Sequence, residues 1–377
     1  MDRTPSRRWF LCTAVPAALT GLAGCAGESD ELTETDAPVL SPTATETATP
    51  TAAPTETDPE VTPIPTVAAS TVAEWVRSFN EGRDPDDQVR FYGFDVQVGQ
   101  GSADRLRSYL DTADSDALAE VGSELDTLVT QGLVGSATPA LEERLAMVEA
   151  VVETLEPRFE DNREAYVAAT SADEYELAKR HVWVLDRARA LATAERSAGM
   201  RIRDRAMADT ASWLLDRHGG GVALWAHNGH VSTADISPGV TSMGGHLRER
   251  HGDAYYALGM EFSGGRFVAR KQQYGSAGTR LSMAAEDPPN GSLLDAFDAT
   301  DRAPFALDFA SIENGDLRDW LARDHALHVV GGATPLDAGW AEHTTEGSPT
   351  EQYDGVIFVG ESSPTRPLGV DVRTPLG

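Results

Sequence analysis

Two residue types are scarce in this chain of 377 residues: cysteine, with two copies, and lysine, which occurs only at Lys179 and Lys271. Cys12 and Cys25 both lie in the first 25 residues, so the rest of the chain carries no thiol. Disulfide bonds, thiolate catalysis and cysteine-ligated zinc are therefore excluded from the rest of the chain.

Positive charge is also in short supply. Asp and Glu total 60 against 31 Lys and Arg, which gives a formal net charge of -29. No basic patch could neutralise phosphates, which argues against a nucleic-acid partner. The acidic excess is typical of a protein kept soluble in high salt, where self-repulsion is screened. We expect a halophilic archaeal lipoprotein, the alternative being an acidic protein of an ordinary bacterium.

Residues 1–25 are predicted to be a lipoprotein export signal. Arg7 and Arg8 form a twin-arginine pair, and the apolar stretch from Cys12 to Gly24 is too short to span a membrane. The stretch ends in Leu-Ala-Gly-Cys, a lipobox that makes Cys25 the lipidation site. We expect export by the twin-arginine route and attachment to the membrane, on its extracellular face, through a lipid anchor.

Residues 26–70 have the composition of a disordered tether. Thr, Pro and acidic residues dominate this stretch, and no Lys or Arg occurs between Arg8 and Arg77. Such a sequence has too few apolar residues to form a core. The remaining residues, 71–370, are enough for one large domain.

Apolar strands alternating with helices predict a mixed α/β domain, with a mostly parallel sheet flanked by helices. Helices are expected over 71–79, 141–155, 172–217 and 243–249, with Pro157 ending the second and Gly199 interrupting the third. Strands are expected over 89–96, 222–224, 255–262, 265–269, 305–309, 327–330 and 355–359. The strands 255–262 and 265–269 should form a β-hairpin around Ser263-Gly264.

Two histidines follow the apolar run 222–224. His227 and His230 flank Asn228 and Gly229 at the carboxyl end of that strand, where open α/β sheets bind their ligands. Imidazoles in such a position can act as a general base, a general acid or a metal ligand. The alternative is a turn in which both histidines satisfy local hydrogen bonds.

Asp95 and Arg203 are further candidates. Asp95 ends a predicted strand, so its carboxylate lies at a pocket rim or accepts backbone hydrogen bonds. Arg203 and Asp204 are neighbours on a predicted helix, and one of them should face the cleft, with Arg203 as a carboxylate or oxyanion ligand. A surface charge is the alternative. His227, His230 and Asp95 could form a two-histidine, one-carboxylate set, but nothing in the sequence shows that they converge, and neither a metal nor another cofactor is predicted.

Several of these stretches resemble the erythromycin esterase family, in the same order and at similar spacing. Arg90–Gln97 is similar to its FYGfDvq strand, Arg203–Asp209 to its RDxxMA helix and Trp225–Val231 to its HNxHV strand end. Later stretches follow in register, at 243–247, 261–267 and 353–358. Together the matching stretches cover most of residues 71–368.

The resemblance implies an antibiotic-resistance-like hydrolase that opens an ester or macrolide lactone with activated water and without a serine nucleophile. The family's activating base is a histidine in a Gly-Glu-x-x-His-Gly loop, which occurs nowhere in this sequence. We therefore expect the leading strands of the family domain to be missing. The chain is either a hydrolase of low activity that depends on His227, His230, Asp95 and Arg203, or a catalytically silent relative that binds a ligand. Exposed strand edges also predict a homodimer or a marginally stable monomer.

Overall fold

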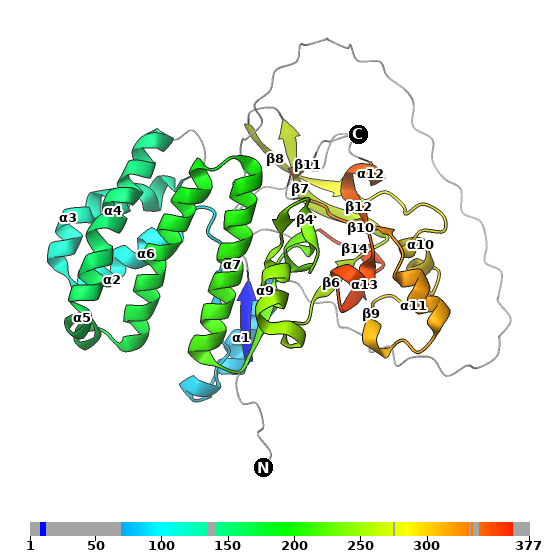
Figure 1. Cartoon of the computed structure of the whole chain (residues 1–377), viewed down its shortest axis with the longest axis horizontal. Coiled ribbons are helices and arrows are strands. Elements are labelled where there is room, and N and C mark those ends of the chain that lie inside the picture. The colour runs from blue at the N-terminus through cyan, green and yellow to red at the C-terminus, as the bar shows by residue number, and fades with distance from the viewer. Residues whose placement is uncertain are drawn as a thin grey trace, which may run out of the picture.

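The structure is a computed structural model that describes residues 8–12, 69–133, 140–273, 276–331, 333–334 and 339–364. Cys25 and the tether up to residue 68 lie outside the described residues. A helical bundle occupies one half of the molecule and several small sheets the other, with the long helix α7 (Arg196–His218) between them (Figure 1). The chain is a mixed α/β protein, as the alternating pattern predicts.

The bundle consists of α2 (Gln100–Ala113), α3 (Ser115–Gln131), α4 (Leu141–Asp161), α5 (Arg163–Ala169) and α6 (Ala172–Thr193). Its core is separate from that of the sheets and includes the fully buried Leu106, Leu125, Val148 and Leu185. Pro157 does not end α4, as expected, but lies inside it. The helix continues because Phe159, beyond the proline, is completely buried in the bundle core. This burial offsets the backbone hydrogen bond that a proline cannot donate.

The expected long helix is two helices, and the break is not at Gly199. α6 ends at Thr193 and α7 begins at Arg196, so Gly199 lies within α7. A Cβ at Gly199 would lie 3.1 Å from Leu191 Cδ1. Glycine here therefore allows close packing of α7 against the end of α6, rather than breaking a helix.

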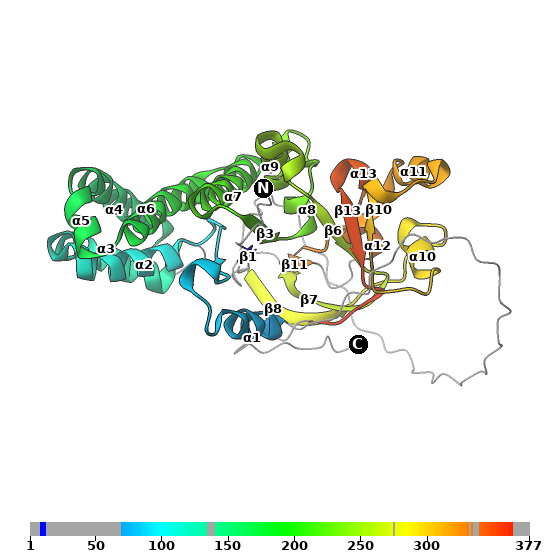
Figure 2. The same cartoon turned by 90° about the horizontal axis from the view of Figure 1, so that it is seen from below.

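Strand β1 (Arg8–Cys12) lies between β2 (Phe91–Tyr92) and β3 (Gly221–Trp225) and is parallel to both. Figure 2 shows β1 beside β3. We expected the leading strands of the family domain to be missing. In the structure, residues of the predicted export signal form the strand between β2 and β3. The expected strand over 89–96 is reduced to Phe91–Tyr92.

A second sheet has β13 (Gly355–Phe358) at its centre, parallel to β6 (Leu258–Glu261) and antiparallel to β9 (Phe305–Asp308). A third contains the antiparallel pair β7 (Gly264–Gln273) and β8 (Ser276–Ala284), with β11 (Ala333–Thr334) and β14 (Glu361–Ser362) parallel to β7. Two antiparallel pairs complete the strands: β10 (His325–His328) with β12 (Thr344–Gly347), and β4 (Asp235–Ser237) with β5 (Val240–Thr241).

The predicted hairpin of residues 255–262 and 265–269 is wrong. β6 pairs with β13, whereas β7 pairs with β8 in a different sheet. A Cβ at Gly265 would lie 2.2 Å from the Ser362 carbonyl oxygen, and its φ is +94°. Glycine at 265 therefore lets the chain turn away from β6 and run beside β14.

Short helices connect these strands. They are α1 (Ala69–Asn80), α8 (Asn228–Val231), α9 (Met243–His251), α10 (Leu293–Asp298), α11 (Gly315–Leu321), α12 (Trp340–His343) and α13 (Pro349–Gln352). α1 and α9 confirm the helices expected near 71–79 and 243–249. Within the described residues, no helix is both long and apolar enough to cross a membrane.

The first two sheets each pack one face against a common core. Leu224, Val356 and Phe358 contribute to this core from β3 and β13. Alternate residues face the other way, and four large apolar ones remain exposed: Phe91, Trp225, Leu258 and Met260.

Candidate active site

The candidate residues converge at the carboxyl ends of three strands. Asp95 follows β2, the helical turn α8 with His230 follows β3, and Glu261 is the last residue of β6. α7 passes beside this edge and contributes Arg203 and Asp204. The arrangement follows the general rule that open α/β sheets place functional groups at the carboxyl ends of their strands.

His230 and Asp204 form a hydrogen-bonded pair. His230 Nδ1 lies 2.8 Å from Asp204 Oδ1, which also accepts a hydrogen bond from the Met243 backbone N–H at 2.9 Å. Asp204 is completely buried, and its Oδ2 has no hydrogen-bond partner in the part of the chain that the structure describes. Because Asp204 Oδ1 already accepts a backbone N–H, we assign it as the acceptor of this bond too, so His230 donates from Nδ1 and leaves Nε2 as the acceptor.

Arg203 and Asp95 form an ion pair through two hydrogen bonds. Arg203 Nε lies 3.0 Å from Asp95 Oδ1, and its Nη2 lies 2.7 Å from Oδ2. The pair joins α7 to the segment after β2, 108 residues earlier. Arg203 and Asp204 therefore both face the sheet side of α7. The alternative of a surface charge does not apply to either residue. A guanidinium held in this way is a preorganised ligand for a carboxylate or an oxyanion.

His227 uses both ring nitrogens on backbone groups. Its Nδ1 accepts from the Gly229 N–H at 3.1 Å, and its Nε2 donates to the Val330 carbonyl at 3.1 Å. Gly229 belongs to α8, so His227 is the N-cap of that turn. Burial of the ring, and then its closeness to His230 and Arg203, lower the pKa of His227, and the hydrogen bond to Val330 opposes this effect. His227 therefore behaves like the turn-capping histidine of the alternative interpretation.

Glu261, His328 and Asn228 form a buried network that the sequence did not reveal. Glu261 accepts hydrogen bonds from the His328 Nδ1 at 3.0 Å and from the His328 backbone N–H at 3.2 Å. Asn228 Nδ2 lies 3.5 Å from the same carboxylate. Burial raises the pKa of Glu261, and His328 opposes that effect. Glu261 could have been found as a carboxylate at the end of an apolar strand, which is the signal that identified Asp95.

The two-histidine, one-carboxylate set does not form, because Asp95 is engaged by Arg203 and His227 by backbone groups. Across the described residues, no cluster of three or more His, Cys, Asp or Glu side chains could hold a metal ion.

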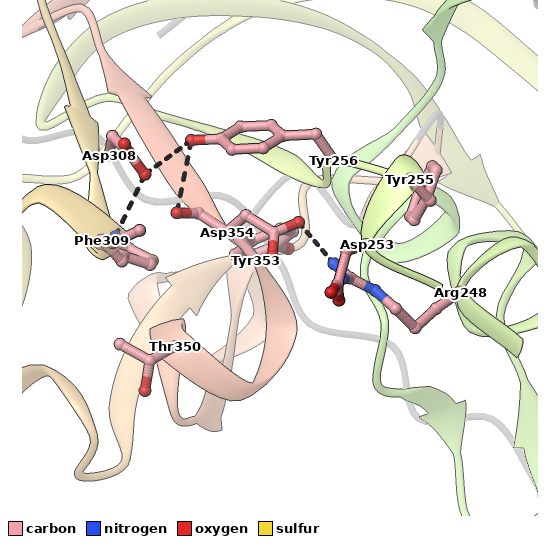
Figure 3. A pocket seen from close by; sticks show the side chains of 10 residues that line it. Arg248, Asp253, Tyr255, Tyr256, Asp308, Phe309, Thr350, Tyr353 and Asp354 are labelled. Carbon is pink, nitrogen blue, oxygen red and sulfur yellow. Dashed lines mark hydrogen bonds and ion pairs between the residues drawn. The ribbon is translucent and has the colours of Figure 1, made fainter. Parts of the chain in front are cut away.

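A hollow of about 300 Å³ lies at the opposite ends of the strands, before β6 and β13 (Figure 3). Within it, the Tyr256 hydroxyl lies 3.1 Å from Asp308 Oδ1, and Arg248 pairs with Asp354. Partial burial and the Asp308 acceptor raise the pKa of Tyr256 to about 12, so its hydroxyl stays protonated and donates. None of the residues predicted from sequence to form the site lines this hollow.

Comparison with known proteins gives a consistent assignment. The sequence profile described as erythromycin esterase matches residues 66–362. No curated protein sequence matches the chain significantly.

Solved structures share the fold. A Bacillus cereus protein superposes with a TM-score of 0.61 at 20% identity, covering 79% of this chain and 73% of that one. A succinoglycan biosynthesis protein gives 0.61 at 19% identity over 78% and 70%. A mutant of the erythromycin esterase EreC in its open conformation gives 0.53 at 14% identity over 80% and 75%.

Proposed function

Because the chain belongs to the erythromycin esterase family, whose membership suggests a hydrolase, we propose that it cleaves an ester or lactone with a water molecule activated at His230. The observation that carries the proposal is the pair of His230 with the buried Asp204. The substrate of this reaction is a small molecule with an ester or lactone group.

Asp204 fixes the tautomer of His230. With Nδ1 donating to the carboxylate, Nε2 presents a lone pair that can take a proton from water as the water attacks the carbonyl carbon. The tetrahedral intermediate then holds a negative oxygen, and the nearby carboxylate stabilises the imidazolium that His230 has become. Return of this proton to the leaving oxygen completes the cleavage.

Arg203 is the candidate ligand of the oxyanion. Asp95 holds its guanidinium at two points, which fixes the orientation of the remaining N–H groups. A preorganised cation of this kind acts where negative charge develops, without having to reorganise during the reaction. His227 caps the α8 turn that carries His230, so we assign it a positioning role.

The test is hydrolysis of a macrolide and of simple aryl esters in molar KCl by the purified full chain. His230→Ala should lower the rate by roughly 10²–10⁴-fold, the usual contribution of general acid–base catalysis. His325→Ala is the control, since His325 contacts the Trp320 carbonyl away from this edge. Equal rates for the unmodified chain and His230→Ala would place the reaction elsewhere.

The alternative is a catalytically silent relative that binds a ligand. It is supported by the absence of any Gly-Glu-x-x-His-Gly sequence in the 377 residues. This alternative predicts that the unmodified chain and both variants are inert, while a macrolide binds with an affinity that Arg203→Ala weakens.

Export and anchoring complete the proposal. The twin-arginine pair and the lipobox support export through the twin-arginine route and a lipid anchor at Cys25 on the extracellular face of the membrane. Cys25→Ser should move the protein from the membrane fraction to the soluble fraction. If Cys25→Ser protein stays in the membrane fraction after a high-salt wash, the anchor is not at Cys25.

A further inference from the structure

The strand Arg8–Cys12 connects β2 and β3, which do not pair with each other in the part of the chain that the structure describes. Phe10 and Leu11 pair with Phe91 and Tyr92 of β2, and all five residues pair with Gly221–Trp225 of β3. In the sheet order, β1 is the central strand, and β2 and β3 pair only with it among the described residues. Without β1, both neighbours would expose unpaired backbone N–H and C=O groups.

The composition of this segment suits that position. Trp9, Phe10 and Leu11 form a continuous apolar run, as central parallel strands commonly do. Aromatic residues also favour extended backbone. The same residues follow the twin-arginine pair and lie within the predicted export signal, so one sequence can satisfy two requirements.

The neighbours of β1 carry the candidate active site. β2 leads to Asp95 three residues after Tyr92, and β3 leads to the α8 turn with His230. The strand therefore fixes the spacing between Asp95, which holds Arg203, and the histidine that we assign as base.

We propose that Arg8–Cys12 is an integral strand of the folded chain, bound in the slot between β2 and β3. Cleavage before Cys25 would sever this strand from the domain. Completion of the sheet and removal of the export signal therefore oppose one another, and the uncleaved chain is the form with the complete site.

Hydrogen exchange on the uncleaved full chain tests this directly and does not depend on catalysis. Amides of residues 9–12 should exchange at least about tenfold more slowly than those of a free peptide with the same sequence. Exchange at the rate of the free peptide would overturn the proposal, whatever the outcome of the hydrolysis assays.

A pair of proline variants adds a second test. Phe10→Pro removes a backbone donor from the centre of the strand. It should abolish protection in 9–12, lower it in 222–225 and reduce the melting temperature by at least about 2 °C. Thr4→Pro, outside the strand, should leave all three unchanged. The proposal is contradicted if Phe10→Pro and Thr4→Pro behave alike, and exchange on the unmodified chain decides the question if Phe10→Pro fails to fold.

Discussion

Asn228 binds the backbone of Met260 with both ends of its side-chain amide. Its Nδ2 donates to the Met260 carbonyl at 2.8 Å, and its Oδ1 accepts from the Met260 N–H at 3.0 Å. The contact makes Asn228 act like a residue of a neighbouring strand, and it ties the turn that carries His230 to β6. Asn228 thus connects the turn after β3, in the first sheet, to β6 in the second.

Asn228→Asp should therefore be strongly destabilising. A carboxylate cannot donate to the Met260 carbonyl, and it would lie beside the buried Glu261. We expect a loss of roughly 2–3 kcal/mol in the free energy of unfolding, measured by urea denaturation in molar KCl. Asn314→Asp is the matched control, because Asn314 accepts from the Leu317 N–H as the cap of α11 and aspartate can do the same. Equal stability of the two variants would contradict this account.

The ion pair of Arg203 and Asp95 should be worth more than the surface pairs. Its side chains are 20% and 7% exposed, against 46% and 60% for Arg107 and Asp126. We expect Asp95→Ala to lower the free energy of unfolding by roughly 1–3 kcal/mol, because it leaves a partly buried cation unpaired. Asp126→Ala should cost less than about 1 kcal/mol. The explanation fails if the two losses are the same.

His181 should make stability depend on pH. Its Nδ1 lies 3.1 Å from Ser102 Oγ, between α6 and α2. Burial, and then the charge of Arg105, lower the pKa of His181 from 6.5 to about 4. The unfolded chain therefore binds a proton that the native chain does not, between about pH 6.5 and about pH 4.

The contribution is full above pH 6.5 and is lost as the pH falls towards 4. We expect the unmodified chain to lose about 2 kcal/mol more than His181→Gln between these limits, by urea denaturation at each pH. The difference between the two proteins removes the contribution of the carboxylates. Parallel pH profiles would show that His181 is not the group responsible.

Self-association is the fourth expectation, since Phe91, Trp225, Leu258 and Met260 leave apolar surface on the sheets. We expect a homodimer by light scattering and a shift towards monomer in Leu258→Ser, because that change removes exposed apolar area. Leu317→Ser is the matched control: Leu317 is 37% exposed and Leu258 36%, but Leu317 lies on α11. A monomeric unmodified chain with a high melting temperature would contradict the expectation.

Local patterns predicted some of the helices, but α2 and α3 of the bundle were not expected, and α6 and α7 were expected as one helix. α1 and α9 begin and end within a few residues of the expected bounds, because capping and the spacing of apolar residues act over one or two turns. Where a residue's role depended on distant packing, the prediction failed. Pro157 stays inside α4 because Phe159 is buried, and Gly199 serves contact with Leu191.

The pairing of strands was harder to predict from the sequence. The hairpin of residues 255–262 and 265–269 looked plausible from spacing, but β6 pairs with a strand about 100 residues later in the chain. β8 was not predicted at all. Strand pairing depends on side chains far apart in sequence, which a single sequence does not display.

At the candidate site, Asp95, Arg203 and His230 were found because polar residues ending apolar strands and helix charges are visible in sequence. The way these residues pair was not visible. That Asp204, rather than another carboxylate, orients His230 follows only from the crossing of α7 and α8, and the Glu261–His328 network follows from the meeting of β6 and β10.

The most direct measurement is a double-mutant comparison of kcat/KM for ester hydrolysis with Asp204→Asn, His230→Ala and both together. If Asp204 acts by orienting His230, each single change lowers kcat/KM by roughly 10²–10⁴-fold, and the double variant is no worse than the His230 variant alone. Losses that multiply in the double variant, or full activity in Asp204→Asn, would contradict the account.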